Sequence, residues 1–266
     1  MYSRIAGTGS YLPERVLSNA DLEKTLDTND EWIRTRTGIE RRHIAAPGQT
    51  TVDLAEQAAR RAIEAAGVSP SEIDFIAFGT TTPDLVFPNC GVLLQARLGV
   101  RGCPALAIET ACTGFIYALS IADKFVRSGE AKCALVVGAE TLSRITDYAD
   151  RSTAILFGDG AGAVILRPSS EAGLLSTHLH ADGEYRDLLY SRGGVSRGFV
   201  DPETGKPDIA IRMAGNEVFK IAVTKLGAAV DEALAANSLE KSAIDWLIPH
   251  QANIRIIQAM ARRLDM

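Results

Sequence analysis

A fifteen-residue window occurs twice in this chain, 171 residues apart, and no other feature limits the fold as much. Residues 62–76 align without a gap to residues 233–247, with five identical positions and four that pair one apolar residue with another. Each window begins in a helical pattern, passes through a turn and ends in a short apolar run typical of a buried strand. The repeat predicts two duplicated α/β halves, although α/β linkers can also resemble one another by chance.

The elements around the first window alternate between helix and strand. Apolar spacing predicts a helix over residues 55–66 that ends at Gly67, and a strand over residues 73–78. Further along, the sequence predicts a helix at 113–128 and strands at 105–108, 133–137 and 163–166. We expect an N-terminal half of residues 1–170 and a C-terminal half of residues 171–266. The last part of the first half has no counterpart in the second, so we expect the second half to be truncated.

Composition limits the function classes. The formal net charge of −5 gives no overall field that would attract a nucleic-acid backbone. The sequence shows no signal peptide and no run of about 18 apolar residues, so we expect a cytoplasmic protein without a membrane span. Its four cysteines form no C-x-x-C pair, which argues against a zinc site and for free thiols.

Cys112 is the strongest candidate for a catalytic residue. It lies between the predicted strand at 105–108 and the apolar helix after it, and Gly114 leaves room for a substrate near the backbone. A thiol at a helix N-terminus feels the positive end of the backbone dipoles, so we expect a lowered pKa. The alternative is a small core residue, the common fate of a free cysteine. For Cys90, Cys103 and Cys133 a structural role is favoured.

His250 is the best partner among the four histidines. It comes after a predicted buried strand at residues 245–248, and open α/β sheets gather ligands at the carboxyl ends of their strands. Asn253 lies within one turn of it, at the start of the predicted last helix. A cysteine and a histidine from different parts of a chain can form an activated pair. A structural histidine is the alternative.

A glycine-rich run at residues 157–162 resembles a phosphate-binding loop only superficially. Its glycines precede a predicted strand and do not open a helix, so no helix N-terminus would face a pyrophosphate. Close backbone packing beside a site is the better interpretation.

Basic residues form two groups despite the acidic total. One lies around Trp32 and includes Arg34, Arg36, Arg41 and Arg42, a combination that suits a ligand with a phosphate and a flat ring. The other would attract an acidic macromolecule and consists of Lys220, Arg255, Arg262 and Arg263. For any single member, a solvated surface charge is the alternative.

Six motifs in order along the whole chain carry a family resemblance. They are G-T-G-S-Y-L-P at 7–13, D-E-W-I-R-T-R-T-G-I at 30–39, A-C-T-G-F at 111–115, F-G-D-G-A-G at 157–162, M-A-G-N-E-V-F at 213–219 and P-H-Q-A-N at 249–253. Together they resemble β-ketoacyl-acyl-carrier-protein synthase III. The resemblance implies an α/β thiolase-like fold, with two duplicated halves, mixed five-stranded sheets and helices in αβαβα layers, the second half incomplete.

The resemblance also implies a reaction. A condensing enzyme of this kind joins a short acyl-CoA to malonyl-acyl carrier protein in a decarboxylative Claisen condensation that starts type II fatty-acid synthesis. Cys112 would hold the acyl group and His250 would hydrogen-bond the malonyl thioester. No metal or other cofactor is implied, since acyl-CoA is a substrate.

Further site residues are implied by the resemblance alone. Coenzyme A would be bound by Trp32, Arg36, Arg151, Asn216 and Phe219. The acyl pocket would be formed by Phe87, Leu142, Phe157 and Leu189, with Phe87 reaching in from the second subunit of a homodimer. The carrier protein would dock on Lys220, Arg255, Arg262 and Arg263.

One departure affects the expected activity. The family's catalytic Asn lies about thirty residues beyond His250, past the last residue of this chain, and Asn253 does not take its role. We therefore expect the chain to load acyl groups poorly, and acyl preference stays open. Two alternatives remain: a thiolase-fold relative that joins two acyl groups, as in polyketide starter or olefin-type enzymes, and a non-catalytic thiolase-like scaffold.

Overall fold

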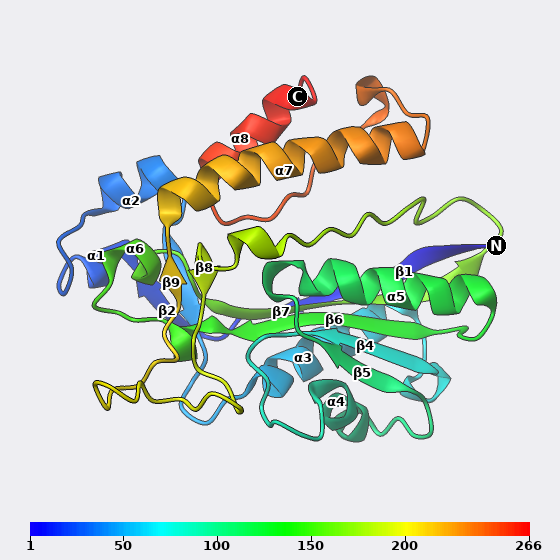
Figure 1. The fold of residues 1–266 in the computed structure, drawn as a ribbon. Coiled ribbons are helices and arrows are strands. Elements are labelled where there is room, and N and C mark those ends of the chain that lie inside the picture. The colour runs from blue at the N-terminus through cyan, green and yellow to red at the C-terminus, as the bar shows by residue number, and fades with distance from the viewer. The chain divides into compact units, whose positions relative to one another are not determined.

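The computed structural model, drawn as a ribbon in Figure 1, describes residues 1–266. They form two compact units that interleave along the chain. Unit 1 consists of residues 1–15, 43–142 and 158–179, and unit 2 of residues 16–42, 143–157 and 180–266. No helix in the structure is both long and apolar enough to cross a membrane.

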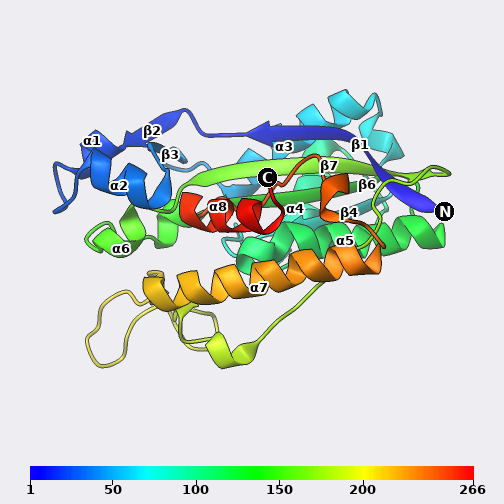
Figure 2. The same cartoon turned by 90° about the horizontal axis from the view of Figure 1, so that it is seen from above.

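Unit 1 is built on a mixed five-stranded sheet. Its strands are β1 (Tyr2–Tyr11), β7 (Asp159–Ser169), β6 (Ala134–Thr141), β4 (Phe75–Gly79) and β5 (Ala105–Ile108), in that spatial order. β4 runs parallel to both β5 and β6, whereas β7 is antiparallel to β6 and to β1, with which it pairs along most of its length (Figure 2). The sheet confirms the predicted mixed α/β class.

Helices cover both faces of this sheet (Figure 1). Alternate residues of β4 point to opposite faces, as the two-residue period of a strand requires. Ile76 and Phe78 pack with α3 (Thr51–Ala66) and α4 (Cys90–Leu98). Phe75 and Ala77 pack with α5 (Gly114–Ser128) on the other face. Because β4 is buried on both faces, its sequence is continuously apolar.

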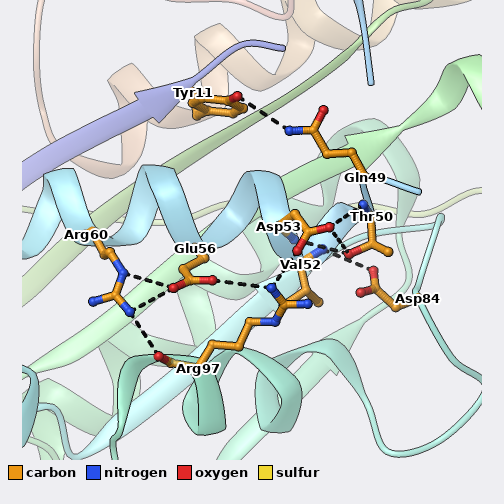
Figure 3. A network of polar contacts seen from close by, with 9 residues as sticks. All are labelled: Tyr11, Gln49, Thr50, Val52, Asp53, Glu56, Arg60, Asp84 and Arg97. Carbon is orange, nitrogen blue, oxygen red and sulfur yellow. Dashed lines mark hydrogen bonds and ion pairs between the residues drawn. The ribbon is translucent and has the colours of Figure 1, made fainter. Parts of the chain in front are cut away.

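Charged side chains join the solvent side of α3 to α4 (Figure 3). Arg97 Nη1 lies 2.5 Å from Asp53 Oδ1 and 3.4 Å from Glu56 Oε2, and Arg60 Nη2 lies 2.8 Å from Glu56 Oε1. Asp53 also completes a capping box with Thr50 at the start of α3. These contacts fix the two helices against each other at their exposed edge.

Unit 2 is mainly helical. Its helices are α1 (Asn19–Leu22), α2 (Asp30–Thr37), α6 (Arg151–Ala154), α7 (Gly215–Ala236) and α8 (Ile254–Arg263). The unit also contains a short sheet of β8 (Leu189–Tyr190) and β9 (Arg212–Met213). A second short sheet consists of β2 (Arg15–Ser18) and β3 (Arg41–Ile44), two strands within which the chain passes from one unit to the other. α8 packs against both α7 and α2.

A buried arginine organises the first part of unit 2. The side chain of Arg42 is 3% exposed; it donates to the carbonyl oxygen of Ile155 from two nitrogens and to Asn19 Oδ1. Burial lowers the pKa of its guanidinium to about 10. Its expected place in the ligand-binding basic group around Trp32 was therefore wrong, and so was the alternative of a solvated surface charge, because its hydrogen bonds are directed into the unit.

The first part of the repeated window, the helix end and the turn after it, adopts the same conformation in both places. The Val68 amide donates to the carbonyl of Ile63, and 171 residues later the Leu239 amide donates to the carbonyl of Leu234. Left-handed residues precede both bonds, Gly67 with φ 64° and Ser238 with φ 53°. A 3₁₀ turn comes next in each case, η1 (Pro70–Glu72) and η5 (Lys241–Ala243). The helix end and turn predicted from the repeat are thus confirmed.

The two copies diverge after the turn. From η1 the chain enters β4, but residues 245–248 form no strand, and Trp246 and Ile248 are 83% and 84% exposed. The predicted buried strand was wrong here, because an apolar run becomes a strand only where neighbouring strands take up its backbone hydrogen bonds. The glycine-rich run at residues 157–162 was predicted to precede a strand, but Gly160 and Gly162 lie inside β7.

Candidate active site

The carboxyl ends of the three parallel strands of unit 1 meet at one edge of the sheet. β5 leads to Cys112, β4 leads to Thr80, and Glu140 lies near the end of β6. The Thr80 amide donates to the carbonyl of Ile108 at 3.1 Å, which ties the ends of β4 and β5 together. Parallel sheets bind ligands at this edge because the loops after several strands converge there.

Cys112 lies in a short 3₁₀ turn, η2 (Ala111–Thr113), immediately before α5. The predicted position at a helix start is confirmed to within two residues. Ala111 has φ 45°, a left-handed conformation that is unusual for a residue with a side chain. Backbone strain of this kind is concentrated at functional sites, where the surrounding structure holds it.

The surroundings of Cys112 destabilise the thiolate form of its side chain. Cys112 is exposed, but neighbouring atoms remove enough water to raise the pKa of the thiol, and the charge of Glu140 raises it further. A hydrogen bond from its own backbone N–H lowers the pKa only in part. The predicted lowered pKa was therefore wrong for these surroundings, because burial and the charge of Glu140 raise the pKa by more than the backbone N–H lowers it.

The other cysteines behave as structural residues. Cys90 and Cys133 are buried, and burial raises the pKa of each thiol to about 11. Cys103 is half-buried and receives a hydrogen bond from Gln95 Nε2. Among the four thiols, Cys112 alone combines exposure with a place at the carboxyl edge of the sheet.

Glu140 was missed by the sequence analysis. Its carboxylate accepts hydrogen bonds from the Thr81 amide at 2.8 Å and from the hydroxyls of Thr80, Thr81 and Thr82 at 3.2, 3.2 and 2.5 Å. Burial raises its pKa although these hydrogen bonds lower it. Three consecutive threonines after an apolar run were a visible signal, but no local pattern indicates that an acid about sixty residues later meets them.

His250 and Asn253 lie in unit 2. His250 is exposed at the end of residues 244–250, which form no regular element, and desolvation lowers the pKa of its imidazole. Asn253 caps α8, since its side-chain oxygen accepts from the Arg255 amide at 2.9 Å. Because Cys112 belongs to unit 1 and His250 to unit 2, their pairing stays a prediction.

Trp32 is the centre of a cationic cluster in unit 2. The guanidinium carbons of Arg36 and Arg151 lie 4.6 and 4.7 Å from the centre of its ring. Arg151 also donates to the carbonyl of Asp27 at 2.7 Å. Arg36 and Arg151, which are far apart in sequence, therefore contact the same ring, which gives a surface of one aromatic face and two positive charges.

The basic residues of α7 and α8 also lie in unit 2, but they are not equivalent. The guanidinium of Arg255 lies 5.0 Å from the centre of the Phe219 ring, while Lys220 and Arg262 are exposed. Arg263 forms a two-pronged ion pair with Asp231, so part of its charge is compensated. Asn216 is the exposed second residue of α7.

The predicted acyl-pocket residues are divided between the units. Phe87, 83% exposed, and half-buried Leu142 belong to unit 1. Half-buried Phe157 and exposed Leu189 belong to unit 2. Their meeting in one pocket stays a prediction.

Comparison with known proteins assigns the family. Models of 3-oxoacyl-[acyl-carrier-protein (ACP)] synthase III and of its C-terminal region match residues 106–183 and 234–266. The beta-ketoacyl-[acyl-carrier-protein] synthase III of Xanthomonas campestris pv. campestris (strain 8004) is 62% identical over 266 residues, covering all of this chain and 81% of that protein. The chain belongs to the β-ketoacyl-acyl-carrier-protein synthase III family.

Solved structures agree with this assignment. The synthase III of Aquifex aeolicus VF5 matches with a TM-score of 0.90 and 45% identity, over 99% of this chain and 81% of that one. The priming β-ketosynthase of the R1128 polyketide biosynthetic pathway matches with a TM-score of 0.89 and 38% identity, over 100% and 79%. The predicted thiolase-like fold is confirmed, and the chain is a condensing enzyme of the acyltransferase class.

Proposed function

We propose that Cys112 is the nucleophile of this synthase III, which starts fatty-acid synthesis by condensing a short acyl-CoA with malonyl-acyl carrier protein. The observation that carries the proposal is the place of Cys112. It is an exposed cysteine in a strained turn at the carboxyl edge of a parallel β-sheet, directly before a helix. The position supports the proposal because an exposed sulfur is accessible to a thioester and backbone N–H groups in a turn can donate hydrogen bonds to a reacting carbonyl.

The first half of the reaction is acyl transfer to the protein. The Cys112 thiolate attacks the thioester carbon of acyl-CoA, the carbon–sulfur bond to coenzyme A breaks, and coenzyme A leaves as a thiolate that takes up a proton. The Cys112 backbone N–H stabilises the tetrahedral oxyanion. Since the surroundings within unit 1 raise the thiol pKa, the proton needs an acceptor. A histidine with a lowered pKa is neutral at pH 7 and suits this role, so we assign it to His250.

The second half forms the carbon–carbon bond. Malonyl-acyl carrier protein loses CO₂, and the electron pair of the broken bond forms an enolate that attacks the acyl carbon on Cys112. The Cys112 sulfur then leaves as a thiolate and the β-ketoacyl product remains on the carrier. A hydrogen bond from His250 to the malonyl thioester oxygen stabilises the enolate. This scheme takes no metal and no redox cofactor.

Binding of coenzyme A is proposed at the Trp32 cluster. An adenine ring can stack on the indole, and the guanidinium groups of Arg36 and Arg151 carry the charge that its phosphates require. Asn216 and Phe219 at the start of α7 are proposed to line the path of the pantetheine arm.

The remaining partners belong to the same proposal. Carrier protein docks on Lys220, Arg255 and Arg262, with a smaller part for the paired Arg263. The acyl pocket is formed by Phe87, Leu142, Phe157 and Leu189, with Phe87 supplied by the second copy in a homodimer; its 83% exposure in one chain agrees with burial against a partner. We place the enzyme in the cytoplasm.

Acyl labelling tests the nucleophile. The protein is incubated with radiolabelled acetyl-CoA, and the labelled peptide is identified by mass spectrometry. We expect label on Cys112, none in Cys112→Ser, and unchanged labelling in Cys103→Ser, which alters a half-buried cysteine near the other end of β5. Label retained by Cys112→Ser would refute the assignment.

A second candidate reaction is priming of a polyketide. The 38% identical priming β-ketosynthase of the R1128 pathway favours it, because that fold and sequence pattern are shared. Turnover with malonyl-acyl carrier protein is compared with turnover on malonyl-CoA and on a second acyl-CoA. Dependence on malonyl-acyl carrier protein supports the fatty-acid reaction, whereas a preference for a second acyl-CoA supports the polyketide-priming alternative.

A further inference from the structure

The carboxylate of Glu140 accepts more hydrogen bonds than a side chain near a strand end needs for the strand to form. The Thr81 amide and hydroxyl donate to its Oε1, and the Thr80 and Thr82 hydroxyls donate to its Oε2. A carboxylate with two donors on each oxygen is well matched to the ionised form. No step of the proposed reaction uses this acid, so its presence beside the nucleophile needs an explanation.

Thr82, one of the threonines that hold Glu140, is itself bound to β6 and α3. Thr82 Oγ1 accepts from the Thr141 amide at 2.8 Å, and the Thr82 carbonyl accepts from Thr51 Oγ1 at 2.6 Å. Just beyond the threonines, Asp84 Oδ1 accepts from the Val52 amide at 3.1 Å in the first turn of α3 (Figure 3). The loop after β4 is thus tied to β6 and α3, with Glu140 at its centre.

The end of β4, from which this loop starts, lies against the start of α5, which directly follows the turn that carries Cys112. Gly79, the last residue of β4, packs so closely on Gly114 that a Cβ on Gly79 would lie 2.4 Å from the Gly114 carbonyl carbon. Gly114 comes two residues after Cys112 and begins α5. The position of residues 79–82 therefore limits where the backbone of the Cys112 turn can lie.

We propose that Glu140 is a positioning residue of the condensation site: its carboxylate gathers Thr80, Thr81 and Thr82 and thereby fixes the backbone against which the Cys112 turn packs. The proposal rests on Cys112 being the nucleophile. A displacement of about 1 Å at a reacting atom can cost up to about a hundredfold in rate, so a carboxylate that fixes this backbone has a large effect without touching substrate.

The charge of Glu140 gives this role a measurable signature. Desolvation raises the pKa of Cys112 most, the charge of Glu140 raises it further, and the backbone N–H of Cys112 lowers it. Other titratable groups on the adjoining segments are Glu109 before the turn, Tyr117 on α5, and Asp159, which pairs with Thr141 across β6 and β7. Asp84 and Cys90 follow β4, and the charges of Asp84 and Glu140 both raise the pKa of Cys90. Removing the Glu140 charge should therefore lower the pKa of Cys112, an effect that a purely structural carboxylate far from the thiol would not have.

The experiment compares Glu140→Gln and Glu140→Ala with Asp74→Asn in the full chain. Asp74 is a matched control, because it accepts from the amides of Lys132 and Cys133 at the opposite end of the β4–β6 pair. Two readouts are used: the rate of Cys112 alkylation by iodoacetamide from pH 6 to 10, with the modified peptide identified by mass spectrometry, and the kcat and KM of acyl transfer from acetyl-CoA. If Glu140→Ala does not fold, Thr82→Val replaces it, since that change removes one hydroxyl bond to Glu140.

The expected results separate charge from position. In Glu140→Gln the alkylation profile shifts to lower pH, with alkylation about two- to fivefold faster at pH 7. Glu140→Ala lowers kcat by about tenfold or more with little change in KM, and Glu140→Gln, which keeps the shape, loses less. Asp74→Asn leaves both readouts unchanged.

Two results overturn the proposal: an alkylation profile in Glu140→Gln that coincides with the wild type, or a kcat in Glu140→Ala equal to that of Asp74→Asn. Failure of the proposed function would look different. If wild-type Cys112 took up no acyl group, the nucleophile assignment would fall, while the alkylation profile, which needs no substrate, would still report on Glu140.

Discussion

Gly79 lies directly against Gly114, with no space for a side chain between the end of β4 and the start of α5. A Cβ on Gly79 would approach the carbonyl carbon and oxygen of Gly114 to 2.4 and 2.6 Å. This contact joins the central strand of the sheet to the helix after the nucleophile. It explains why the strand ends in glycine at position 79.

Replacing Gly79 should damage the site through its backbone. We expect Gly79→Ala to lose about 1–3 kcal/mol of unfolding free energy, because a methyl group placed against backbone forces the two elements apart. Acyl transfer to Cys112 should fall as well, measured by labelling at saturating acetyl-CoA. Gly162→Ala is the control, since a Cβ at Gly162 meets nothing within 4 Å. Equal stability and equal acyl transfer in the two variants would show that the Gly79–Gly114 contact determines neither property.

Arg151 should contribute to coenzyme A binding and little to chemistry. Its guanidinium and the Trp32 ring lie 4.7 Å apart, so Arg151→Ala removes one charge and one stacking surface. We expect KM for acetyl-CoA to rise about two- to fivefold with kcat nearly unchanged. Arg192→Ala, which removes a similar pair with Tyr190 at 5.5 Å, should leave KM as it is. A fall in kcat at constant KM would contradict this role.

Arg255 should act on the carrier protein. Reversal of its charge in Arg255→Glu should raise KM for malonyl-acyl carrier protein about tenfold at low salt, and this effect should shrink as salt screens the surface. Loading from acetyl-CoA should change less. Lys206→Glu reverses another exposed charge of unit 2 and serves as the control. Equal loss in the loading and carrier assays would rule out a docking role for Arg255.

Asp53 should make stability depend on pH. Burial raises its pKa, but hydrogen bonds from Thr50 and the charge of Arg97 lower it more, so the folded pKa lies below the unfolded one. Such a carboxylate stabilises the fold above the unfolded carboxyl pKa, and the stabilisation is lost as pH falls through the folded pKa. Asp53→Asn should therefore cost about 1 kcal/mol at pH 7.

Urea unfolding at several pH values measures this effect. The difference between wild type and Asp53→Asn should be constant at neutral pH and shrink once the pH falls below about 4. Asp187→Asn, at a side chain that is 78% exposed, should show a small difference at every pH. A gap between wild type and Asp53→Asn that persists at pH 2 would argue against a charge effect.

Ser238 and Gly67 occupy equivalent positions and should respond in opposite ways. Both have a left-handed backbone, with φ 53° and 64°, but only glycine adopts it without strain. We expect Ser238→Gly to raise the unfolding free energy by about 0.5–1 kcal/mol and Gly67→Ser to lower it by a similar amount. Thermal unfolding measures both, and a destabilised Ser238→Gly would be contrary to the geometry.

Local pattern was enough to predict much of this fold. The apolar spacing that ends at Gly67 predicted α3, because helix periodicity and a C-cap glycine depend only on neighbours in sequence. The strand before Cys112 and the helix after it were predicted for the same reason. The chemistry-bearing motifs also identified the family, since six short motifs in order are specific even when each is weak.

Tertiary structure decided the rest. The run at 245–248 has strand character, but Trp246 is exposed, because a strand exists only where another strand pairs with it. The pKa of Cys112 moves opposite to the helix-start expectation, because packing desolvates the thiol and the sheet also brings the charge of Glu140 close to it. Sequence determines which groups can form a local element; distances between residues far apart in the chain are set by packing, and electrostatics depends on those distances.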